Sequence, residues 1–200
     1  MNSQNEIAVA VELMNIFEDV DKYPVFLDLM SGAHTYFPRT LTGKFIGIGL
    51  NEVELQANKR LNGFQTQDIN SNPHLTYKDN HFSGVLMNNG IGYVDHPIKL
   101  FKEVHRVLKP GASFAVVFDY RAELSVISRY WKKTRSQRER VKLVLSFFAK
   151  AGNYKDIKAK RIYDWQGFPI PYFSISAHKA AGKVRSGSSP INPQSEIRFA

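Results

Sequence analysis

The stretch from Val25 to Pro38 constrains this chain more than any other part of its sequence. It opens with a short apolar run, Val25–Leu29, that contains a single acid, and small or polar residues follow at once. An apolar run of this length, ended by a turn, is typical of a strand buried on both faces of a parallel sheet. Ligands of open α/β sheets bind beyond the carboxyl ends of such strands. Residues 28–34 are therefore predicted to form the floor of a binding site.

Strands and helices alternate along most of the chain. The pattern predicts a helix at about 5–20, later helices at 51–61, 97–108 and 129–148, and strands at 25–29, 44–49, 64–69, 82–87 and 113–118. Two late alternating segments, 155–163 and 172–178, are typical of an antiparallel pair. This order favours a single α/β domain over residues 1–180, with a core sheet at 25–178 and helices on both faces. Residues 181–200 are rich in Gly, Ser and Pro without periodicity, which predicts a disordered tail.

Composition excludes several classes of protein. Hydrophobic residues make up 43% of the chain and charged residues 22%, which is ordinary for a globular protein. The chain has no cysteine, which excludes disulfides, thiolate metal sites and a cysteine nucleophile. No spacing of His, Asp and Glu suggests a metal site. No apolar run reaches the roughly 20 residues of a membrane span, and the acidic N-terminus does not resemble a signal peptide, so a cytoplasmic location is expected.

The net charge of +9 is unevenly distributed. The first 28 residues hold six acids and one base, whereas residues 129–142 hold seven bases and one acid. Such a basic region can bind an anionic partner, which includes phosphate, an anionic membrane surface or an acidic protein. A solvated helix face with no partner is the alternative interpretation.

The order of motifs resembles a known family. The relevant segments are Leu27-Asp28-Leu29 before a Gly-containing turn, Gly47-Ile48-Gly49, Gln67-Asp68-Ile69, and the run Glu-Val-His-Arg-Val-Leu-Lys-Pro-Gly-Ala-Ser-Phe at 103–114. Over about residues 25–120 the chain is similar to class I S-adenosylmethionine-dependent methyltransferases of the type 11 branch. The resemblance implies a Rossmann-like, mostly parallel seven-stranded sheet of order 3-2-1-4-5-7-6. It also implies that S-adenosylmethionine lies across the ends of strands one, two and four.

The chain departs from the family pattern at the cofactor loop. The family has Asp-x-Gly-x-Gly-x-Gly, whereas residues 28–34 keep only Gly32 and place Met30 and His34 where glycines are expected. The nearby Pro38 predicts that the first crossover helix is short or missing. Gly49 stands where the family has an acid for the ribose hydroxyls, and Asn51 and Glu52 are the nearest substitutes. Asp68 is retained where the family's acid meets the adenine amino group.

The resemblance implies a set of cofactor-binding residues, which are Asp28, Met30, Ser31, Gly32, His34, Gly49, Leu50, Asn51, Asp68, Ile69 and Asn88. A general base is needed only if the acceptor begins protonated. The candidates near the strand ends are His34, Tyr93, Asp119 and Tyr120, together with Asn88 and Asn89. Each also has a structural interpretation, as a hydrogen-bonded loop residue or as part of a left-handed turn. The catalytic residue is therefore not assigned.

Three functions follow from these observations. The first is a divergent S-adenosylmethionine-dependent methyltransferase that acts on a small-molecule acceptor, since no separate substrate domain is evident. The second is a catalytically inactive methyltransferase-like binding or scaffold protein that has lost the cofactor site. The third is a nucleic-acid methyltransferase that uses the basic face 129–142, where Tyr130 and Trp131 accompany the bases. The acceptor and the oligomeric state are left open.

Overall fold

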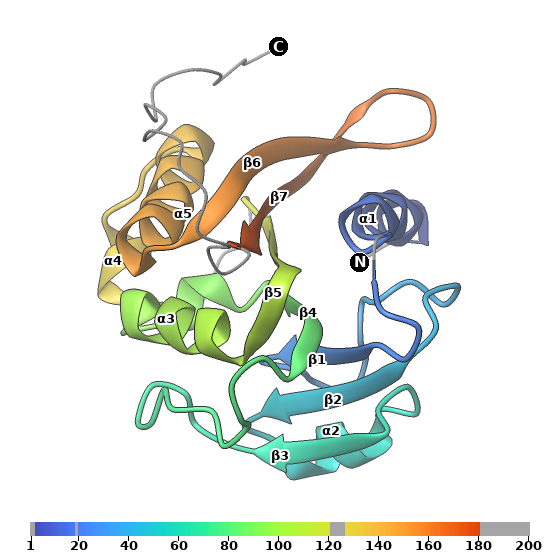
Figure 1. The fold of residues 1–200 in the computed structure, drawn as a ribbon. Helices are drawn as coiled ribbons and strands as arrows, with labels where there is room; N and C mark the ends of the chain where they lie inside the picture. The colour runs from blue at the N-terminus through green and yellow to red at the C-terminus, as the bar shows by residue number, and fades with distance from the viewer. Residues whose placement is uncertain (1–2, 19, 121–126, 181–200) are drawn as a thin grey trace, which may run out of the picture.

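Seven strands form one sheet with the order β3-β2-β1-β4-β5-β7-β6 (Figure 1). The computed structural model describes residues 3–18, 20–120 and 127–180. The strands are β1 (Val25–Leu29), β2 (Lys44–Gly49), β3 (Gly63–Thr66), β4 (Phe82–Asn88), β5 (Leu108–Asp119), β6 (Tyr154–Tyr163) and β7 (Pro169–Lys179). The first five strands, β1 through β5, are all parallel to their neighbours among these five, and β7 is antiparallel to both β5 and β6. The predicted sheet order is confirmed, and the predicted tail at 181–200 lies outside the described residues.

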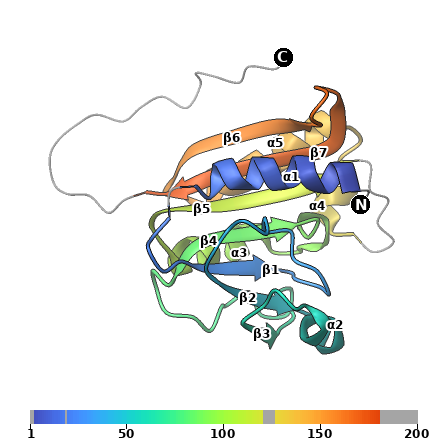
Figure 2. The ribbon, with the colours of Figure 1, turned by 90° about the vertical axis from the view of Figure 1, so that its right-hand side faces the viewer.

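Helices cover both faces of this sheet, as predicted (Figures 1 and 2). They are α1 (Ser3–Ile16), α2 (Glu52–Ala57), the 3-10 helix η1 (Ile91–Tyr93), α3 (Pro97–Val107), α4 (Arg129–Lys132) and α5 (Gln137–Ala151). α1 packs on the same face as α2, whose Leu55 lies against the face of β2 that carries Gly47 and Gly49. α3 and α5 pack on the opposite face.

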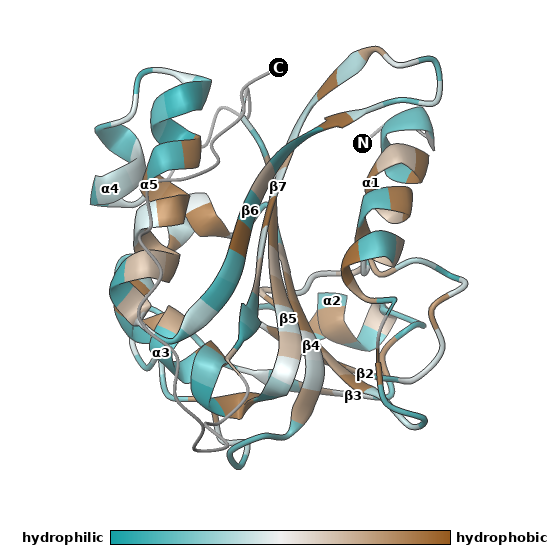
Figure 3. Ribbon diagram, turned by 45° about the horizontal axis from the view of Figure 1, so that its top comes forward, coloured by the Kyte–Doolittle hydropathy of each residue, from teal (hydrophilic) through white to brown (hydrophobic). Residues whose placement is uncertain are grey.

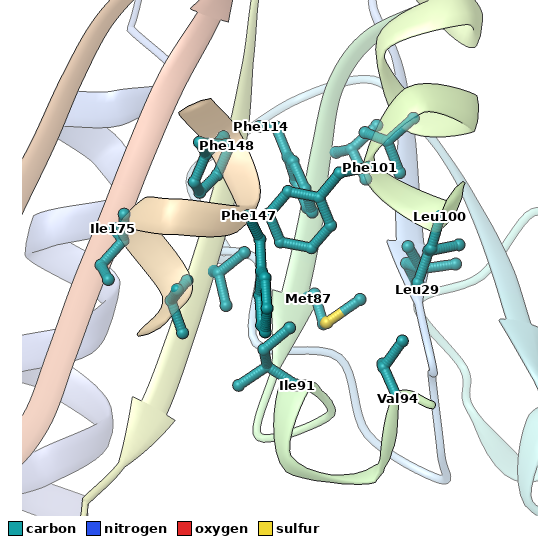
Figure 4. Close-up of a cluster of buried hydrophobic side chains, with 14 of the residues drawn as sticks. Leu29, Met87, Ile91, Val94, Leu100, Phe101, Phe114, Phe147, Phe148 and Ile175 are labelled. Carbon is teal, nitrogen blue, oxygen red and sulfur yellow. The ribbon is translucent and has the colours of Figure 1, made fainter. Parts of the chain in front are cut away.

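The larger hydrophobic cluster lies between β1, β4, β5 and the helices α3 and α5 (Figure 4). Phe101 of α3 meets Phe114 of β5 and Phe148 of α5 with ring centroids 4.9 and 4.8 Å apart. Edge-to-face contacts of this kind add about 0.5–1.5 kcal/mol each beyond their area burial. This packing fixes β4 and β5, and therefore fixes the loops at their carboxyl ends.

A loop replaces the first crossover helix. No helix joins β1 to β2, and residues 30–43, all of them described, form turns and extended chain. Phe37 and Leu41 of this loop are buried on the α1 face of the sheet. The Phe37 ring packs within 5.2–5.3 Å of the rings of Phe17, Phe26 and Phe45. The prediction of a short or missing helix is confirmed, because aromatic side chains cover the surface that a helix would bury.

Several segments differ from the predicted elements. α2 ends at Ala57, although a helix is predicted over 51–61, and β3 ends at Thr66, although a strand is predicted over 64–69. The basic region is not one helix, because Ser136 caps a second helix by accepting from Glu139 N and thereby separates α4 from α5.

Residues 109–111, which fall between the predicted helix at 97–108 and the predicted strand at 113–118, lie within β5 as a bulge. Phe82 pairs with Leu108 and Gly84 with Ser113, so four residues of β5 stand opposite one residue of β4.

We expect Phe37→Ala to lower the free energy of unfolding by about 3–5 kcal/mol, because the buried ring leaves a cavity that the neighbouring rings cannot fill. Denaturant unfolding measures the change. Tyr23→Ala is the control, since Tyr23 is 78% exposed and should change stability by about 0.5 kcal/mol or less. Equal losses in the two variants would contradict the core role of the loop.

Candidate functional site

A cavity of about 580 Å³ opens at the carboxyl ends of β1, β2 and β4. This volume lies within the usual range of about 300–1,000 Å³ for small-molecule sites. Its wall is formed by Met30, Ser31, Gly32, Ile48, Gly49, Leu50, Asn51, Glu54, Gln67, Asp68, Ile69, Asn70, Asn88, Asn89, Gly90, Tyr93, Asp95, Ile127 and Ser128. The structure thus brings nine of the eleven predicted cofactor-binding residues to one cavity. The other two, Asp28 and His34, lie elsewhere.

The loop after β1 forms the floor of the cavity. Met30 adopts a left-handed conformation with φ of 61°, although it is not glycine, which costs about 1–2 kcal/mol. Its thioether packs on Gly90, where an added Cβ would lie 2.6 Å from the sulfur. Met30 therefore keeps the backbone conformation of the expected glycine, and Gly90 makes room for its side chain.

A buried polar network holds this loop. The Asp28 carboxylate, whose residue is only 3% exposed, accepts from Ser31 Oγ at 2.9 Å. Asn58, which follows α2, donates from Nδ2 to the backbone oxygen of Gly32 at 3.0 Å. Burial raises the pKa of Asp28 to about 6, although hydrogen bonds from Thr35 and Ser31 act in the opposite direction. Asp28 therefore lies beneath the loop and supports it without lining the cavity.

Gly49 ends β2 where the loop crosses it. The amide of Ser31 donates to the backbone oxygen of Ile48 at 2.7 Å. A Cβ added at Gly49 would lie 2.2 Å from the backbone oxygen of Ser31. No side chain fits at position 49 while the loop keeps this path, so the acid of the family pattern has no space there.

α2 brings a carboxylate to the same end of the cavity. Asn51 caps α2 by accepting from the amides of Val53 and Glu54. Asn51 Nδ2 in turn donates to Glu54 Oε1 at 3.1 Å, and Glu54 Oε2 lies 3.0 Å from the Cβ position of Gly32. Glu52, the substitute suggested by the sequence, is absent from the wall. The capping-box spacing of Asn51 and Glu54 was the signal that could have identified Glu54.

Asp68 lies in the turn after β3, because β3 ends at Thr66 and not at the predicted residue 69. Its carboxylate accepts from Ser71 Oγ at 2.6 Å and from Asn70 N at 2.9 Å. These hydrogen bonds, that of the Ser71 hydroxyl first, lower the pKa of Asp68 and keep it ionised. Asn70 then bonds the backbone of Tyr93 and Asp95 at 2.9 Å each. These hydrogen bonds connect the turn after β3 to the segment after β4, and the two segments together close this side of the cavity.

The end of β4 supplies an amide without a partner. Asn88 lines the cavity, and both its Oδ1 and Nδ2 are buried with no hydrogen-bond partner among the described residues. The next residue, Asn89, is left-handed with φ of 53° and accepts from Asp119 N at 2.8 Å. Asn89 therefore joins β4 to β5. Leaving a buried amide unpaired costs about 1–3 kcal/mol, so Asn88 is the wall residue that most requires a polar ligand.

The candidate catalytic residues are spread over several places. Tyr93 lines the cavity. His34 faces a separate groove beside α1, because the loop turns toward that helix after Gly32. Asp119 is tied to Asn89 through its amide, and the Tyr120 hydroxyl accepts from Arg161 at 3.2 Å. The structure does not bring these four side chains together, and their roles stay predictions.

Aromatic residues of the basic region pack inward. Trp131 is only 3% exposed, and its ring meets the edge of Phe118 with centroids 5.4 Å apart. Tyr130 packs against Phe147. The Trp131 ring is therefore not presented for base stacking and the Tyr130 ring is only partly exposed, which weakens the aromatic part of the nucleic-acid interpretation.

Residues 29–116 match the family described as "Methyltransferase domain". No curated protein sequence matches the chain. Among solved structures, the [4+2]-cyclase SpnF is 16% identical with a TM-score of 0.63, covering 87% of this chain and 81% of its own. An S-adenosylmethionine-dependent methyltransferase from Aquifex aeolicus is 18% identical with a TM-score of 0.60, covering 90% and 94%. Geranyl diphosphate C-methyltransferase from Streptomyces coelicolor A3(2) is 15% identical with a TM-score of 0.59, covering 88% and 81%. At these identities the likeness to solved structures establishes the shared fold.

We expect Gly49→Ala to destabilise the protein by about 2 kcal/mol or more, because the new methyl group meets the Ser31 backbone. Gly63→Ala is the matched control, since its Cβ would lie 3.4 Å from Ile46 in ordinary contact. Denaturant unfolding of both variants tests the loop path. A Gly49 variant as stable as the Gly63 variant would show that the loop does not cross β2 in this way.

Asp28→Asn is expected to change how stability depends on pH. The pKa of Asp28 rises from 3.8 in its ordinary state to about 6 in the fold, so the native state binds this proton more tightly than the unfolded chain does. The wild-type protein therefore loses this contribution as pH rises from about 4 through about 6, and at most about 3 kcal/mol is lost. The variant should lack this loss.

Urea unfolding at pH 4 and at pH 7 measures the difference between wild type and variant. Asp156→Asn, at an exposed position of β6, controls for removal of a carboxylate. The same pH dependence in all three proteins would contradict the burial of an ionisable Asp28.

Proposed function

We propose that this protein, whose residues 29–116 match the methyltransferase domain family, is a class I S-adenosylmethionine-dependent methyltransferase that binds S-adenosylmethionine in the cavity and methylates a small-molecule acceptor. The charge of the cavity carries the proposal. Glu54, Asp68 and Asp95 line it, and its described wall contains no lysine, arginine or histidine, although the chain has a net charge of +9. An acid-lined cavity favours a cation. S-adenosylmethionine carries a sulfonium and an ammonium against one carboxylate, whereas phosphate-bearing cofactors are anionic.

The wall residues suit the parts of this cofactor. Ile48, Leu50 and Ile69 offer apolar contact for the adenine ring, and Asp68 offers an acceptor for its amino group. Glu54 is the available carboxylate for the ribose hydroxyls, since Gly49 has no side chain. The backbone of residues 30–32 and the unpaired amide of Asn88 are the groups left for the methionine end. The cofactor would supply a methyl group bound to a positively charged sulfur, and this sulfur leaves readily because it departs as the neutral thioether of S-adenosylhomocysteine.

The chain's own task in such a reaction is positioning. Methyl transfer is an in-line displacement, so holding the acceptor against the methyl group contributes more than proton transfer does. Tyr93 is the catalytic candidate that we propose for orienting the acceptor, because it is the one of the four in the cavity wall. A cytoplasmic location stays a prediction, and the sequence makes no prediction of which small molecule is the acceptor.

A second candidate function is a protein that keeps the fold without methyl transfer. Two observations favour it, which are the methionine in a left-handed conformation at position 30 and the absence of a side chain at Gly49. The structural neighbour SpnF has a similar fold but is named for a different reaction, a [4+2]-cyclisation, as expected when one fold serves several functions. A binding or scaffold role belongs to the same candidate. The nucleic-acid alternative keeps its basic residues, but the aromatic rings beside them are the half-buried Tyr130 and the buried Trp131.

Calorimetric titration with S-adenosylmethionine and S-adenosylhomocysteine tests the proposal. We expect micromolar or tighter binding, equivalent to about 8 kcal/mol or more, and no binding of adenosine triphosphate because of the acidic wall. If titration with S-adenosylmethionine at millimolar concentration gives neither heat nor a thermal shift, the result would favour the second candidate.

Glu54→Gln should weaken S-adenosylmethionine binding about tenfold, since it removes one charged hydrogen-bond acceptor. Glu52→Gln is the matched control on the same helix, because Glu52 is exposed and lies outside the cavity wall. Asp68→Asn, which keeps an oxygen for the Asn70 amide, should also weaken binding. Unchanged affinity in both cavity variants would show that the cofactor, if bound, lies elsewhere.

A further inference from the structure

The turn between β6 and β7 exposes large aromatic side chains. Trp165 is 75% exposed and Phe168 is 64% exposed, and Tyr163 beside them is also exposed. Single exposed apolar residues are normal on protein surfaces, but neighbouring large aromatic residues on one turn mark an interaction site. We call residues 163–168 the hairpin tip.

The hairpin tip has a defined structure. The Asp164 carboxylate accepts from the amides of Gln166 at 3.0 Å and Phe168 at 2.8 Å. The backbone of Asp164 also bonds to Phe168 O at 2.8 Å and to Gly167 N at 3.0 Å, and Gly167 takes a φ of 82°. The turn is therefore held by its own hydrogen bonds and presents Trp165 and Phe168 to solvent in a fixed arrangement.

The tip lies at the edge of the sheet where the cavity opens. β6 runs parallel to β1–β5, because β7 is antiparallel to both β5 and β6. β5 ends at Asp119, which pairs with Tyr172, whereas the hairpin continues to the pair formed by Tyr163 and Pro169. Three further residues extend the hairpin about 10 Å beyond the end of β5. Figure 1 shows this hairpin projecting from the body of the molecule on the side where α1 lies.

Exposed arginines and lysines lie at the same carboxyl edge of the sheet. Arg129, Lys132, Lys133 and Arg135 are all exposed, and we call them the basic rim. The amide of Ser128, a cavity residue, donates to Gly92 O at 2.8 Å, and Arg140 bonds the backbone oxygen of Tyr120 just after β5. These bonds fix the rim beside the carboxyl ends of β4 and β5. Figure 3 shows hydrophilic α4 and the first turns of α5 at the same end of the molecule as the hairpin.

We propose that this edge docks on the surface of an anionic lipid bilayer, with the hairpin tip in the headgroup region and the basic rim against the anionic lipids. Trp and other amphipathic aromatics favour the membrane interface. Each Lys or Arg near an anionic surface adds to binding, and an apolar anchor together with a basic patch binds more stably than either alone. The charge of the rim and the exposure of the tip are complementary to such a surface.

A membrane fits these observations better than a nucleic acid does. Protein grooves that bind single-stranded nucleic acid place aromatic side chains for stacking among their lysines and arginines. Here Trp131 is buried, and the exposed rings of Trp165 and Phe168 lie on the hairpin tip, away from the basic rim. Among the described residues no helix is long and apolar enough to cross a bilayer, so the contact would be peripheral. Docking would also turn the cavity toward the bilayer, and an acceptor dissolved in lipid is then the substrate class that follows, a step that rests on the proposed function.

Sedimentation of the full-length protein with vesicles tests the docking without any cofactor. We expect binding to vesicles of phosphatidylcholine mixed with phosphatidylglycerol and much weaker binding to phosphatidylcholine alone. Lys132→Gln combined with Lys133→Gln should lower the partition constant about thirtyfold. Lys150→Gln combined with Lys155→Gln, at exposed positions near the opposite edge, is the matched control and should leave it nearly unchanged.

The aromatic anchor is tested in the same assay. Trp165→Ala combined with Phe168→Ala should lower partition at least about tenfold, and Tyr23→Ala is the matched control. Trp131 is already buried, so a blue shift of tryptophan emission on adding anionic vesicles should report Trp165 and disappear in Trp165→Phe.

Three results would overturn the docking proposal. The first is equal partition of the wild type and the Trp165/Phe168 variant into anionic vesicles. The second is a failure to bind anionic vesicles, whether or not the protein binds neutral ones. The third is tight binding of single-stranded RNA in place of vesicles. Calorimetry with S-adenosylmethionine in the absence of lipid fails or succeeds independently. A protein that binds vesicles but not the cofactor would therefore retain the docking surface and lose the proposed reaction.

Discussion

The close approach of the loop after β1 to the end of β2 is the contact on which the rest of the site depends. The Ser31 amide bonds to Ile48 O at 2.7 Å, and the Ser31 carbonyl occupies the space of a side chain at Gly49. A carboxylate on this side of the cavity must then come from another element. α2 provides Glu54 because its capping residue, Asn51, is separated from the end of β2 by only one residue. The loss of an acid from one strand and its presence on the next helix have a single geometric cause.

Polar contacts hold the loop where conformational freedom of glycine is expected. Met30 carries a left-handed backbone, and Asp28 is buried with a raised pKa, so two unfavourable features lie next to each other. Ser31, Thr35 and Asn58 offset them by hydrogen bonding the carboxylate and the loop backbone. Strain and perturbed ionisation concentrate at functional sites. This network keeps the loop in one conformation whether or not the cavity binds S-adenosylmethionine.

The sequence predicted the sheet because each strand is a short apolar run ended by a turn, and this pattern depends on local residues. It also predicted the missing crossover helix from the proximity of Pro38. The path of the loop could not be predicted from the sequence, since the close contact between Ser31 and Gly49 joins residues 18 positions apart. Glu54 was missed for a related reason. Its capping spacing is visible in the sequence, but its position over Gly32 requires the packing of α2 on β2.

The distribution of charge connects the cavity with the surface around it. Carboxylates line the cavity, whereas the basic rim lies outside it on α4 and the turn that follows α4. A cation is attracted into the cavity and an anionic surface is attracted to the rim, so the two ligands do not compete. Charges separated by more than a Debye length of about 8–10 Å are largely screened from each other where solvent lies between them. The hairpin tip adds apolar contact where the rim supplies charge. The two proposed ligands, a small cation and a large anionic surface, would therefore bind at separate places along the carboxyl edge of the sheet, because different elements carry the opposite charges.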